Sequence, residues 1–551
     1  MNPHLTTRGV WVFICSLVFI AAGAVFEQPL LLMMGQVQVA LLSVSFLICV
    51  VAALALDRRF VTLSVGSEAD STGRSTTMVV GRSLELDIFV RNNAWLPLYG
   101  LGVEPFGSDT LDFDKSDSDF HLPTQSKGSM AMRVTGSRIG RWMLHGFDVA
   151  LRDPLGLLEA RDYLPCPHAF ECLPRSASRG AQNGRARNLG AFALQHGGKH
   201  MVRHIGSGSV VRELRDYQPG DPLRHIAWKT TARNRRLISR DFEREVTLSM
   251  YLLLDISTSM RGGQWQGQKL EHGIETATEI ASSVLSARDR VGLMTFDEKL
   301  YGHIAPTVSP SQITRILQHL VGVNSVVDEE LTEWSDIELA QKVCDYLVVQ
   351  ERLDFRRGDK VDPDSGVNLE LLNRWIESTL ASQESQFDSP LLHQGIIEEE
   401  TSSLRRFAQL RGLELPYRVE ARLGLKERGL QQAIERIVAT AHESQWVVII
   451  SDLCGVMNTE LVTRSIRLAQ HQGHSLRVFA PFTPAYYEDD DDGSERYRIS
   501  RELFSTRERE ERLKIAGHLR SLGVPVDFMK PGQSGMQILT QAKGRRGLAA
   551  H

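Results

Sequence analysis

The most informative part of this chain is the stretch Leu252-Leu253-Leu254-Asp255-Ile256-Ser257-Thr258-Ser259-Met260. Its apolar first part predicts a buried strand, after which Asp255, Ser257 and Ser259 bring oxygen-bearing side chains at alternating positions. Mg²⁺ prefers a near-octahedral shell of oxygen ligands and keeps several waters, so this loop suits the ion if a second loop completes the shell. The alternative is an ordinary strand-to-helix turn in which the serines only cap the next helix.

Strand and helix patterns alternate after this stretch. Helical spacing is expected at residues 269–287 and 313–320, and apolar strands at 291–296, 446–452, 476–480 and 524–528. This order predicts a doubly wound α/β domain, in which ligands bind beyond the carboxyl ends of the strands. The strand at 446–452 ends in Asp452, so we expect Asp452 and Asp255 at the same edge of the sheet.

The pattern formed by Asp255, Ser257, Ser259 and Asp452 resembles the metal-ion-dependent adhesion site of von Willebrand factor type A domains. The resemblance implies that the site binds a partner's carboxylate through Mg²⁺, with Mn²⁺ as a substitute, and does not catalyse a reaction. It also implies that Asp452 contributes to the metal shell through water.

The middle ligand of such sites is normally a threonine at the start of a helix, and two alignments stay open here. In the first, Ser335 within residues 332–339 replaces the threonine and keeps a hydroxyl. In the second, the loop at 424–430 precedes a helix at 431–442 and offers no hydroxyl, which makes the site degenerate.

Two uncharged apolar runs, residues 10–26 and 37–56, lie near the start of the sequence. Each approaches or reaches the roughly 20 residues that a membrane-spanning helix needs. A cleavable signal peptide would have a shorter apolar core and no second span directly after it. Arg8 precedes the first run, Arg58 and Arg59 follow the second, and only Glu27 lies between, which predicts a multi-pass hairpin with both ends in the cytoplasm. The alternative is a pair of buried helices in a soluble protein.

The chain divides into four parts by pattern. Residues 1–59 form the expected transmembrane hairpin, and short alternating runs at 60–175 predict an antiparallel β-sandwich. Residues 176–199 are rich in Ser, Gly, Arg and Asn and open a linker and arginine-rich segment that reaches residue 245. Residues 246–551 hold the α/β domain, with a helical insertion at about 351–423.

The arginine-rich segment contains Arg212-Glu213-Leu214-Arg215-Asp216-Tyr217-Gln218-Pro219-Gly220-Asp221-Pro222-Leu223-Arg224-His225-Ile226-Ala227-Trp228-Lys229-Thr230-Thr231-Ala232-Arg233. It resembles the signature of the bacterial domain-of-unknown-function-58 family, Arg-Glu-Tyr-x-x-Gly-Asp-x-x-Arg-x-Ile-x-Trp-x-x-Ala-Arg, which lies just upstream of a type A fold. The chain departs from that signature at Asp216 and Ala227. The resemblance implies a protein of the bacterial inner (cytoplasmic) membrane and a MoxR-type AAA ATPase as partner.

Two interpretations of this segment stay open. Arginine forks match carboxylates in bidentate pairs, so the segment is either an internal ion-pair network or a docking patch for an acidic partner surface. The residues concerned are Arg212, Arg215, Asp221, Arg224, Trp228 and Arg233. Nucleic-acid binding is disfavoured, because the net charge of the chain is -4 and the basic excess of the segment is small.

The sequence gives little support for an enzyme. No Gly-x-Ser-x-Gly elbow surrounds Ser257 or Ser259, and none of the 17 histidines is arranged as their base. The six cysteines are scattered and lack ligand spacing for zinc. We therefore expect neither catalysis nor a small-molecule substrate.

These patterns together predict a membrane-anchored cytoplasmic protein-binding module. Its contact with a protein partner is Mg²⁺-assisted, and its role with a MoxR-type ATPase is chaperone-like or in complex assembly. One alternative is a structural membrane scaffold with a degenerate metal loop, which binds through the arginine-rich segment and the insertion. The other is a metal-dependent hydrolase.

Overall fold

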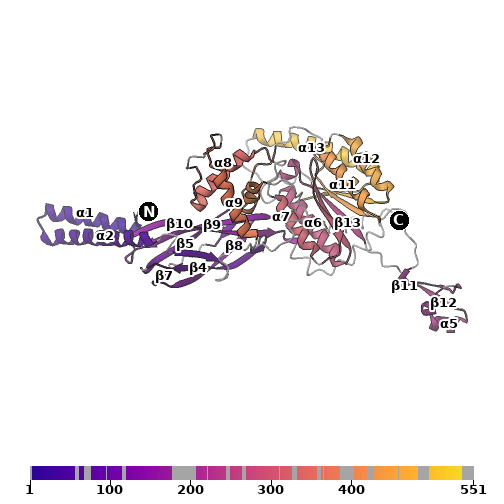
Figure 1. Cartoon of the computed structure of the whole chain (residues 1–551), viewed down its shortest axis with the longest axis horizontal. Helices are drawn as coiled ribbons and strands as arrows, with labels where there is room; N and C mark the ends of the chain where they lie inside the picture. The colour runs from indigo at the N-terminus through magenta and orange to yellow at the C-terminus, as the bar shows by residue number, and fades with distance from the viewer. Residues whose placement is uncertain are drawn as a thin grey trace. The chain divides into compact units, whose positions relative to one another are not determined.

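The structure is a computed structural model (Figure 1), and it describes residues 3–55, 61–66, 76–94, 96–114, 120–176, 206–219, 221, 223–242, 248–262, 268–309, 311–324, 332–356, 361–363, 365–384, 402–413, 415–418, 426–456, 458–481 and 495–535. Residues 177–199 of the linker expected at 176–199 lie outside these residues. The chain forms two compact units, residues 1–175 with 317–420 and residues 176–316 with 421–551.

The first unit begins with two apolar helices, α1 (Thr7–Val25) and α2 (Pro29–Ala55), which pack against each other (Figure 1). The side chain of Thr6 caps α1 by accepting a hydrogen bond from the amide of Gly9. Both helices are long and apolar enough to cross a membrane, and most of their large apolar side chains are exposed. Water would not favour that surface, whereas lipid would, so the two helices suggest a membrane anchor.

The sheet-rich region of the first unit contains two sheets. One has the strand order β1-β10-β9-β5-β7 with β3 beside β10, and the other has the order β2-β4-β8-β6. The strands are β1 (His4–Leu5), β2 (Val61–Val65), β3 (Thr76–Val79), β4 (Ser83–Asn92), β5 (Leu98–Gly107), β6 (Leu111–Phe113), β7 (Phe120–Leu122), β8 (Lys127–Gly136), β9 (Gly140–Arg152) and β10 (Leu158–Leu173). All pairs are antiparallel except β3 with β10. Alternate residues of β4 and β8, such as Ile88 and Met132, are buried, as the period-two pattern predicts.

The same unit contains a helical part with its own core. Its elements are α8 (Asp336–Tyr346), the single π-turn η4 (Leu347–Glu351), α9 (Leu369–Glu384) and α10 (Ser403–Leu410). Buried residues such as Leu347, Ile376 and Phe407 hold these elements together. The hydroxyl of Tyr346 lies 3.2 Å from Nδ1 of His145 on β9. The helical part starts at α8, before the expected residue 351. The contact between Tyr346 and His145 shows that it packs on the sheet-rich region.

The second unit opens with a small hairpin, which we call the signature segment (residues 206–242). Strands β11 (Gly206–Asp216) and β12 (Ile238–Phe242) pair antiparallel, and the short helices η2 (Leu223–His225) and α5 (Trp228–Asn234) connect them. Among the side chains that the structure describes in this segment, the apolar ones of Ile226, Ala227 and Ile238 are buried.

The rest of the second unit is an α/β region around a sheet of order β15-β14-β13-β16-β17-β18. The strands are β13 (Ser249–Asp255), β14 (Arg290–Phe296), β15 (Leu300–Thr307), β16 (Trp446–Ile450), β17 (Ser475–Pro481) and β18 (Val526–Met529). The helices are α6 (Lys269–Ser286), α7 (Gln312–Asn324), which begins in this unit, α11 (Lys426–Thr440), α12 (Thr459–His471) and α13 (Glu495–Ser521). Only β15 pairs antiparallel; the other described pairs are parallel.

The central strand β13 is buried along its whole length, which fits its uninterrupted apolar sequence. Tyr251 and Leu253 join the core formed with α11, α12 and α13, whereas Leu254 approaches Gly273 of α6. Alternate residues of the strand thus serve opposite faces of the sheet. Strand β13 has β14 on one side and β16 on the other, so the strand order reverses at β13. In such sheets the ligand site lies at the carboxyl ends of the strands where the order reverses, here β13 and β16.

Candidate functional site

The two aspartates expected at the sheet edge lie there, and both are fully buried. Asp255 ends β13, and Asp452 lies two residues beyond the end of β16. The hydroxyl of Ser451 donates to Oδ2 of Asp255 at 2.6 Å, and the amide of Ser257 donates to Oδ1 at 3.0 Å. Each carboxylate oxygen of Asp255 therefore has a fixed partner.

The serines of the motif complete this cluster. Their two hydroxyl oxygens lie 3.1 Å apart, and that of Ser259 donates to Oδ1 of Asp452 at 3.0 Å. Ser257 precedes the short helix η3 (Thr258–Arg261), but its side chain makes no capping hydrogen bond, and the next long helix, α6, is preceded by Gln268. Four of the sequence-predicted site residues, Asp255, Ser257, Ser259 and Asp452, thus come together.

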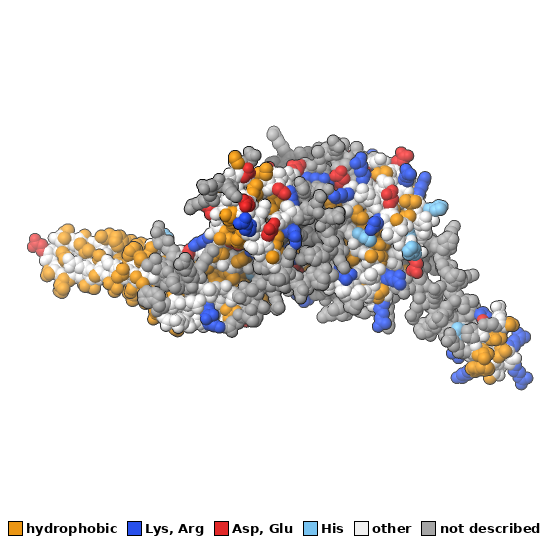
Figure 2. All heavy atoms as spheres, in the orientation of Figure 1, with side chains coloured by type: hydrophobic (Ala, Val, Ile, Leu, Met, Phe, Trp, Pro, Cys, Tyr) orange, Lys and Arg blue, Asp and Glu red, His pale blue; other side chains and the backbone are white. Residues whose placement is uncertain are grey.

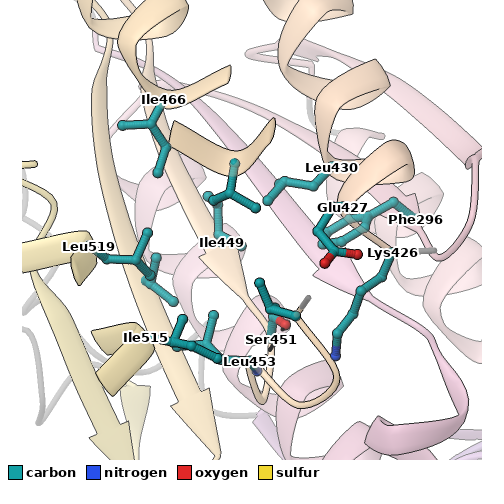
Figure 3. Close-up of a pocket in the computed structure, with 13 residues that line it drawn as sticks. Phe296, Lys426, Glu427, Leu430, Ile449, Ser451, Leu453, Ile466, Ile515 and Leu519 are labelled. Atoms are coloured by element: carbon teal, nitrogen blue, oxygen red, sulfur yellow. Dashed lines mark hydrogen bonds between the residues drawn. The ribbon is translucent and has the colours of Figure 1, made fainter. Parts of the chain in front are cut away.

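A lysine that the sequence did not single out lies among them. Lys426 is the first residue of α11, and its side chain extends toward the loop after β16 (Figure 3). Its Nζ lies 3.1 Å from the Ser259 hydroxyl, 3.1 Å from Oδ1 of Asp452 and 3.4 Å from Oδ2 of Asp255. Only 8% of the side chain is exposed.

Two more cations approach Asp452 from other helices. Nζ of Lys269, at the start of α6, donates to Oδ2 of Asp452 at 2.7 Å, and the Arg512 guanidinium of α13 lies 3.6 Å from the same atom. Burial alone would raise the pKa of Asp452, but Lys426, Lys269 and Arg512 hold it well below its usual range. Burial alone would lower the pKa of Lys426, but Asp255 and Asp452 raise it above its ordinary value. Asp452 and Lys426 therefore stabilise each other in their charged forms.

This donor set does not fit a divalent metal. Nζ of Lys426 already contacts oxygens of Asp255, Ser259 and Asp452, three of the groups that would bind the ion, and an ammonium is no ligand for Mg²⁺. A doubly charged ion would also enter a cluster in which three cations already lie near two carboxylates, and like charges repel strongly away from water. Among the residues that the structure describes, no group of three or more His, Cys, Asp or Glu could hold a metal.

The remaining predicted ligand, Ser335, lies in the first unit, at the N-cap of α8. Its side chain accepts from the amide of Glu338, whose carboxylate in turn accepts from the amide of Ser335, a complete capping box. Of the two alignments for the middle ligand, the start of α11 is the one that reaches Asp255 and Asp452. It brings a lysine and no hydroxyl there, as the second alignment expected of its loop.

The contact between Ser259 and Lys426 also bears on hydrolytic chemistry. A serine nucleophile can be activated by a neutral lysine, which needs a lowered pKa. The pKa of Lys426 is instead raised by Asp255 and Asp452, so the side chain stays an ammonium, which has no lone pair to accept the serine proton. The arrangement suits a buried ion-pair network better than a nucleophile with its base.

A small cavity borders this cluster. It has a volume of about 30 Å³ and lies between the sheet and helices α11, α12 and α13. Its walls are mostly apolar, including Ile449, Leu453 and Ile515, with Lys426 and Ser451 at its edge (Figure 3). Such a space holds one or two waters and is too small for a metabolite.

The predicted residues of the signature segment differ in their surroundings, because some are paired with each other and others are exposed. The guanidinium of Arg215 donates to both oxygens of Asp221, each at 2.8 Å, and this contact lowers the pKa of Asp221. Arg233 and Trp228 are exposed. The side chains of Arg212 and Arg224 lie outside the described part of the chain. The first pair thus has an internal structural contact, and the other two residues face outward.

Residues 213–359 match the model of a family described as "Protein of unknown function DUF58". The resemblance expected from the signature is therefore confirmed for this part of the chain. A relative in Bacillus subtilis (strain 168), the uncharacterized protein YeaD, is 24% identical over 288 residues, which cover 50% of this chain and 68% of that protein.

Two solved structures share less with the chain. The conserved hypothetical protein BatB from Bacteroides thetaiotaomicron is 10% identical with a TM-score of 0.23, over 54% of this chain and 98% of that chain. A FixG-related protein from Vibrio parahaemolyticus is 8% identical with a TM-score of 0.13, over 20% of this chain and 95% of that chain.

Proposed function

We propose that this chain, which carries the DUF58 segment at residues 213–359, is a membrane-anchored scaffold that binds a protein partner through its signature segment. The observation that carries the proposal is the exposure of large apolar side chains on a small hairpin. Leu214, Leu223, Trp228 and Leu237 are 48%, 69%, 62% and 47% exposed.

Exposed apolar side chains that gather on one surface mark interaction sites more often than isolated ones do. Figure 2 shows hydrophobic atoms together on the visible face of the signature segment, with Lys and Arg atoms at its margins. An apolar centre with a charged rim is the usual composition of a protein interface, and Trp and Arg are the residues that contribute most to binding there.

The charge of this surface indicates the kind of partner. Lys229, Arg233, Arg235 and Arg236 are all exposed, and no acidic residue interrupts residues 228–236. Asp221 is already neutralised by Arg215. An acidic protein surface with an apolar centre would complement both features.

The hairpin also has a frame that can present this surface. A two-stranded sheet is marginally stable alone, so its local contacts matter. The Arg215–Asp221 pair closes the loop after β11, and the amide of Ala227 donates to the carbonyl of Ile238 at 2.8 Å. The amide of Ile238 in turn donates to the Thr231 hydroxyl at 3.1 Å. These contacts fix α5 on the hairpin and leave Trp228 outward.

The other parts of the proposal follow the sequence. Helices α1 and α2 serve as a two-pass anchor in a bacterial inner membrane, and Arg8, Arg58 and Arg59 keep both ends in the cytoplasm. The sheet-rich region acts as a sandwich-like spacer and the α/β region as a type A-like domain. The partner is a MoxR-type AAA ATPase, and the role is chaperone-like or in complex assembly.

The test is binding of the full chain, in detergent, to a purified MoxR-type AAA ATPase from the same bacterium. The variant Trp228→Ala/Arg233→Glu should lose most of the binding, because it removes the apolar centre and reverses a rim charge. The matched control is Leu468→Ala/Arg467→Glu, which alters an exposed pair on α12 and should bind as wild type does. Equal binding by the two variants would refute the proposal, and so would binding of the segment to anionic vesicles in place of the ATPase.

A further inference from the structure

We infer that the ammonium of Lys426 is the resident cation of the site at the carboxyl ends of β13 and β16, and that the site works without metal. The inference goes beyond the proposed function, because it concerns the α/β region and not the signature segment. It rests on the position of Nζ among the residues that were expected to hold Mg²⁺.

The hydrogen bonds of Lys426 use every donor of its ammonium. An ammonium has three N–H donors and no acceptor. Nζ of Lys426 has an acceptor for each of them, on Asp255, Ser259 and Asp452. A metal in such a site keeps an open coordination position for an incoming carboxylate, whereas this ammonium has no donor left for one. The site is therefore closed to a partner's carboxylate.

The chain holds Lys426 in this position through two contacts of α11. At Gly429, one turn further along α11, an added Cβ would lie 2.2 Å from the carbonyl oxygen of Asp297, so α11 lies against the turn after β14. The carboxylate of Glu427 accepts from the amide of Asn458 at 3.0 Å, which ties the same turn of α11 to the loop before α12. The packing of α11 thus fixes the position of Lys426, whose side chain is buried.

Lys426 links the carboxyl ends of two strands. Asp255 and Asp452 lie at the carboxyl ends of different strands, and Lys426 contacts both from a third element. Its positive charge lies between the two strand ends and offsets both buried carboxylates, as a divalent ion would in the expected metal site. The site then stabilises the carboxyl ends of β13 and β16, and a protein partner binds to another surface of the chain.

The experiment titrates Mg²⁺ and Mn²⁺ into the full chain in detergent and follows heat and the unfolding temperature. The wild type should give no saturable heat, and neither Mg²⁺ nor a chelator should change its Tm. Saturable Mg²⁺ binding by the wild type that is lost in Asp255→Ala would overturn the inference.

A variant makes the test positive as well as negative. Lys426→Thr removes the ammonium and supplies the hydroxyl that the resembled sites use. It should lower the Tm, and saturating Mg²⁺ should restore about 2–4 °C of it, as expected for a ligand that binds only the folded state. The control Lys530→Thr changes an exposed lysine and should show neither effect. An Lys426→Thr protein as stable as wild type, or one whose Tm ignores Mg²⁺, would also overturn the inference. If Lys426→Thr does not fold, the wild-type titration still decides.

Discussion

Nζ of Lys426 lies 3.1 Å from Oδ1 of Asp452, and this contact joins the first turn of α11 to the loop after β16. Both side chains are almost fully buried, so water does little to screen their attraction. The pair belongs to a network in which Lys269 takes the second oxygen of Asp452. Several elements of the α/β region therefore depend on one carboxylate.

The variant Asp452→Asn should lower the free energy of unfolding by about 3–5 kcal/mol, because a near-isosteric amide removes the buried negative charge that Lys269, Lys426 and Arg512 share. Urea unfolding of the full chain in detergent measures this loss. The control Glu370→Gln breaks an exposed pair with Arg374 and should cost about 0–1 kcal/mol. A loss below 1 kcal/mol for Asp452→Asn would show that the network contributes little.

The contact of α11 with the turn after β14 gives a second prediction. Gly429→Ala should destabilise the chain by roughly 1–3 kcal/mol, since its Cβ would overlap the Asp297 carbonyl and push α11, with Lys426, away from the site. Gly517→Ala on α13 is the matched control, because an added Cβ there meets nothing within 4 Å. It should be neutral or stabilising by about 0.5–1 kcal/mol. Thermal unfolding of the two variants side by side makes the comparison, and similar values would contradict it.

The sequence predicts the α/β region and the two apolar helices well, because both rest on continuous local patterns. Strand β13 is a buried apolar run, and α1 and α2 are long apolar runs that the structure shows as helices. It also predicts that Asp255 and Asp452 meet, since parallel strands bring their carboxyl ends to one edge. Each of these inferences needs only the chain's periodicity and the rules of sheet topology.

The identity of the group between the two aspartates could not be predicted in the same way. Gly429 lets the start of α11 approach the turn after β14, and this contact between segments more than 100 residues apart in sequence helps to place Lys426. The hydroxyl pattern pointed to Ser335, which serves its own helix as a cap. Arg512 arrives from α13 with no local signal. The adjacent Ser451 and Lys269, at a predicted strand end and helix start, are residues that strand-end reasoning could have included.

The pH dependence of stability is a third prediction, and it concerns the sheet-rich region. Burial lowers the pKa of His168 to about 4, and burial followed by the nearby Arg411 lowers the pKa of His145 to about 4. In the unfolded chain both titrate near 6.5. The contribution of the two histidines to the free energy of unfolding should therefore be fully present above pH 6.5 and fall as the pH drops from 6.5 to 4. In that window the two histidines take up protons in the unfolded chain but not in the folded one. Each histidine contributes up to about 3 kcal/mol to this fall.

Urea midpoints at pH 7.5, 6 and 4.5 measure the effect. The variant His168→Gln should lose part of the pH dependence, whereas His471→Gln, at an exposed position of α12, should keep all of it. If the urea midpoint of His168→Gln falls with pH as steeply as that of the wild type, His168 is excluded as a source of the pH dependence.

The fourth prediction separates the two features of the signature segment by their kinetics. Exposed charges act over distances that salt screens, so they mainly set the association rate, whereas an apolar anchor mainly sets the dissociation rate. The triple variant Arg233→Gln/Arg235→Gln/Arg236→Gln should therefore slow association with the acidic partner about tenfold or more at low salt and flatten its dependence on ionic strength. Trp228→Ala should keep the salt dependence and raise the dissociation rate, with about 2 kcal/mol or more of affinity lost.

Surface kinetics on the immobilised full chain from 50 to 500 mM salt would measure both rates. Because the side chain of Trp228 is largely exposed, Trp228→Ala should leave the stability of the chain within about 0.5 kcal/mol of wild type, so a binding defect reports the surface itself. Arg215→Ala provides the opposite pattern, since it strips Asp221 of its bidentate partner and should expose the hairpin to proteolysis. Identical rate constants for the triple variant and the wild type at every salt concentration would remove the acidic partner from consideration. A dissociation rate unchanged by Trp228→Ala would remove the tryptophan as the anchor.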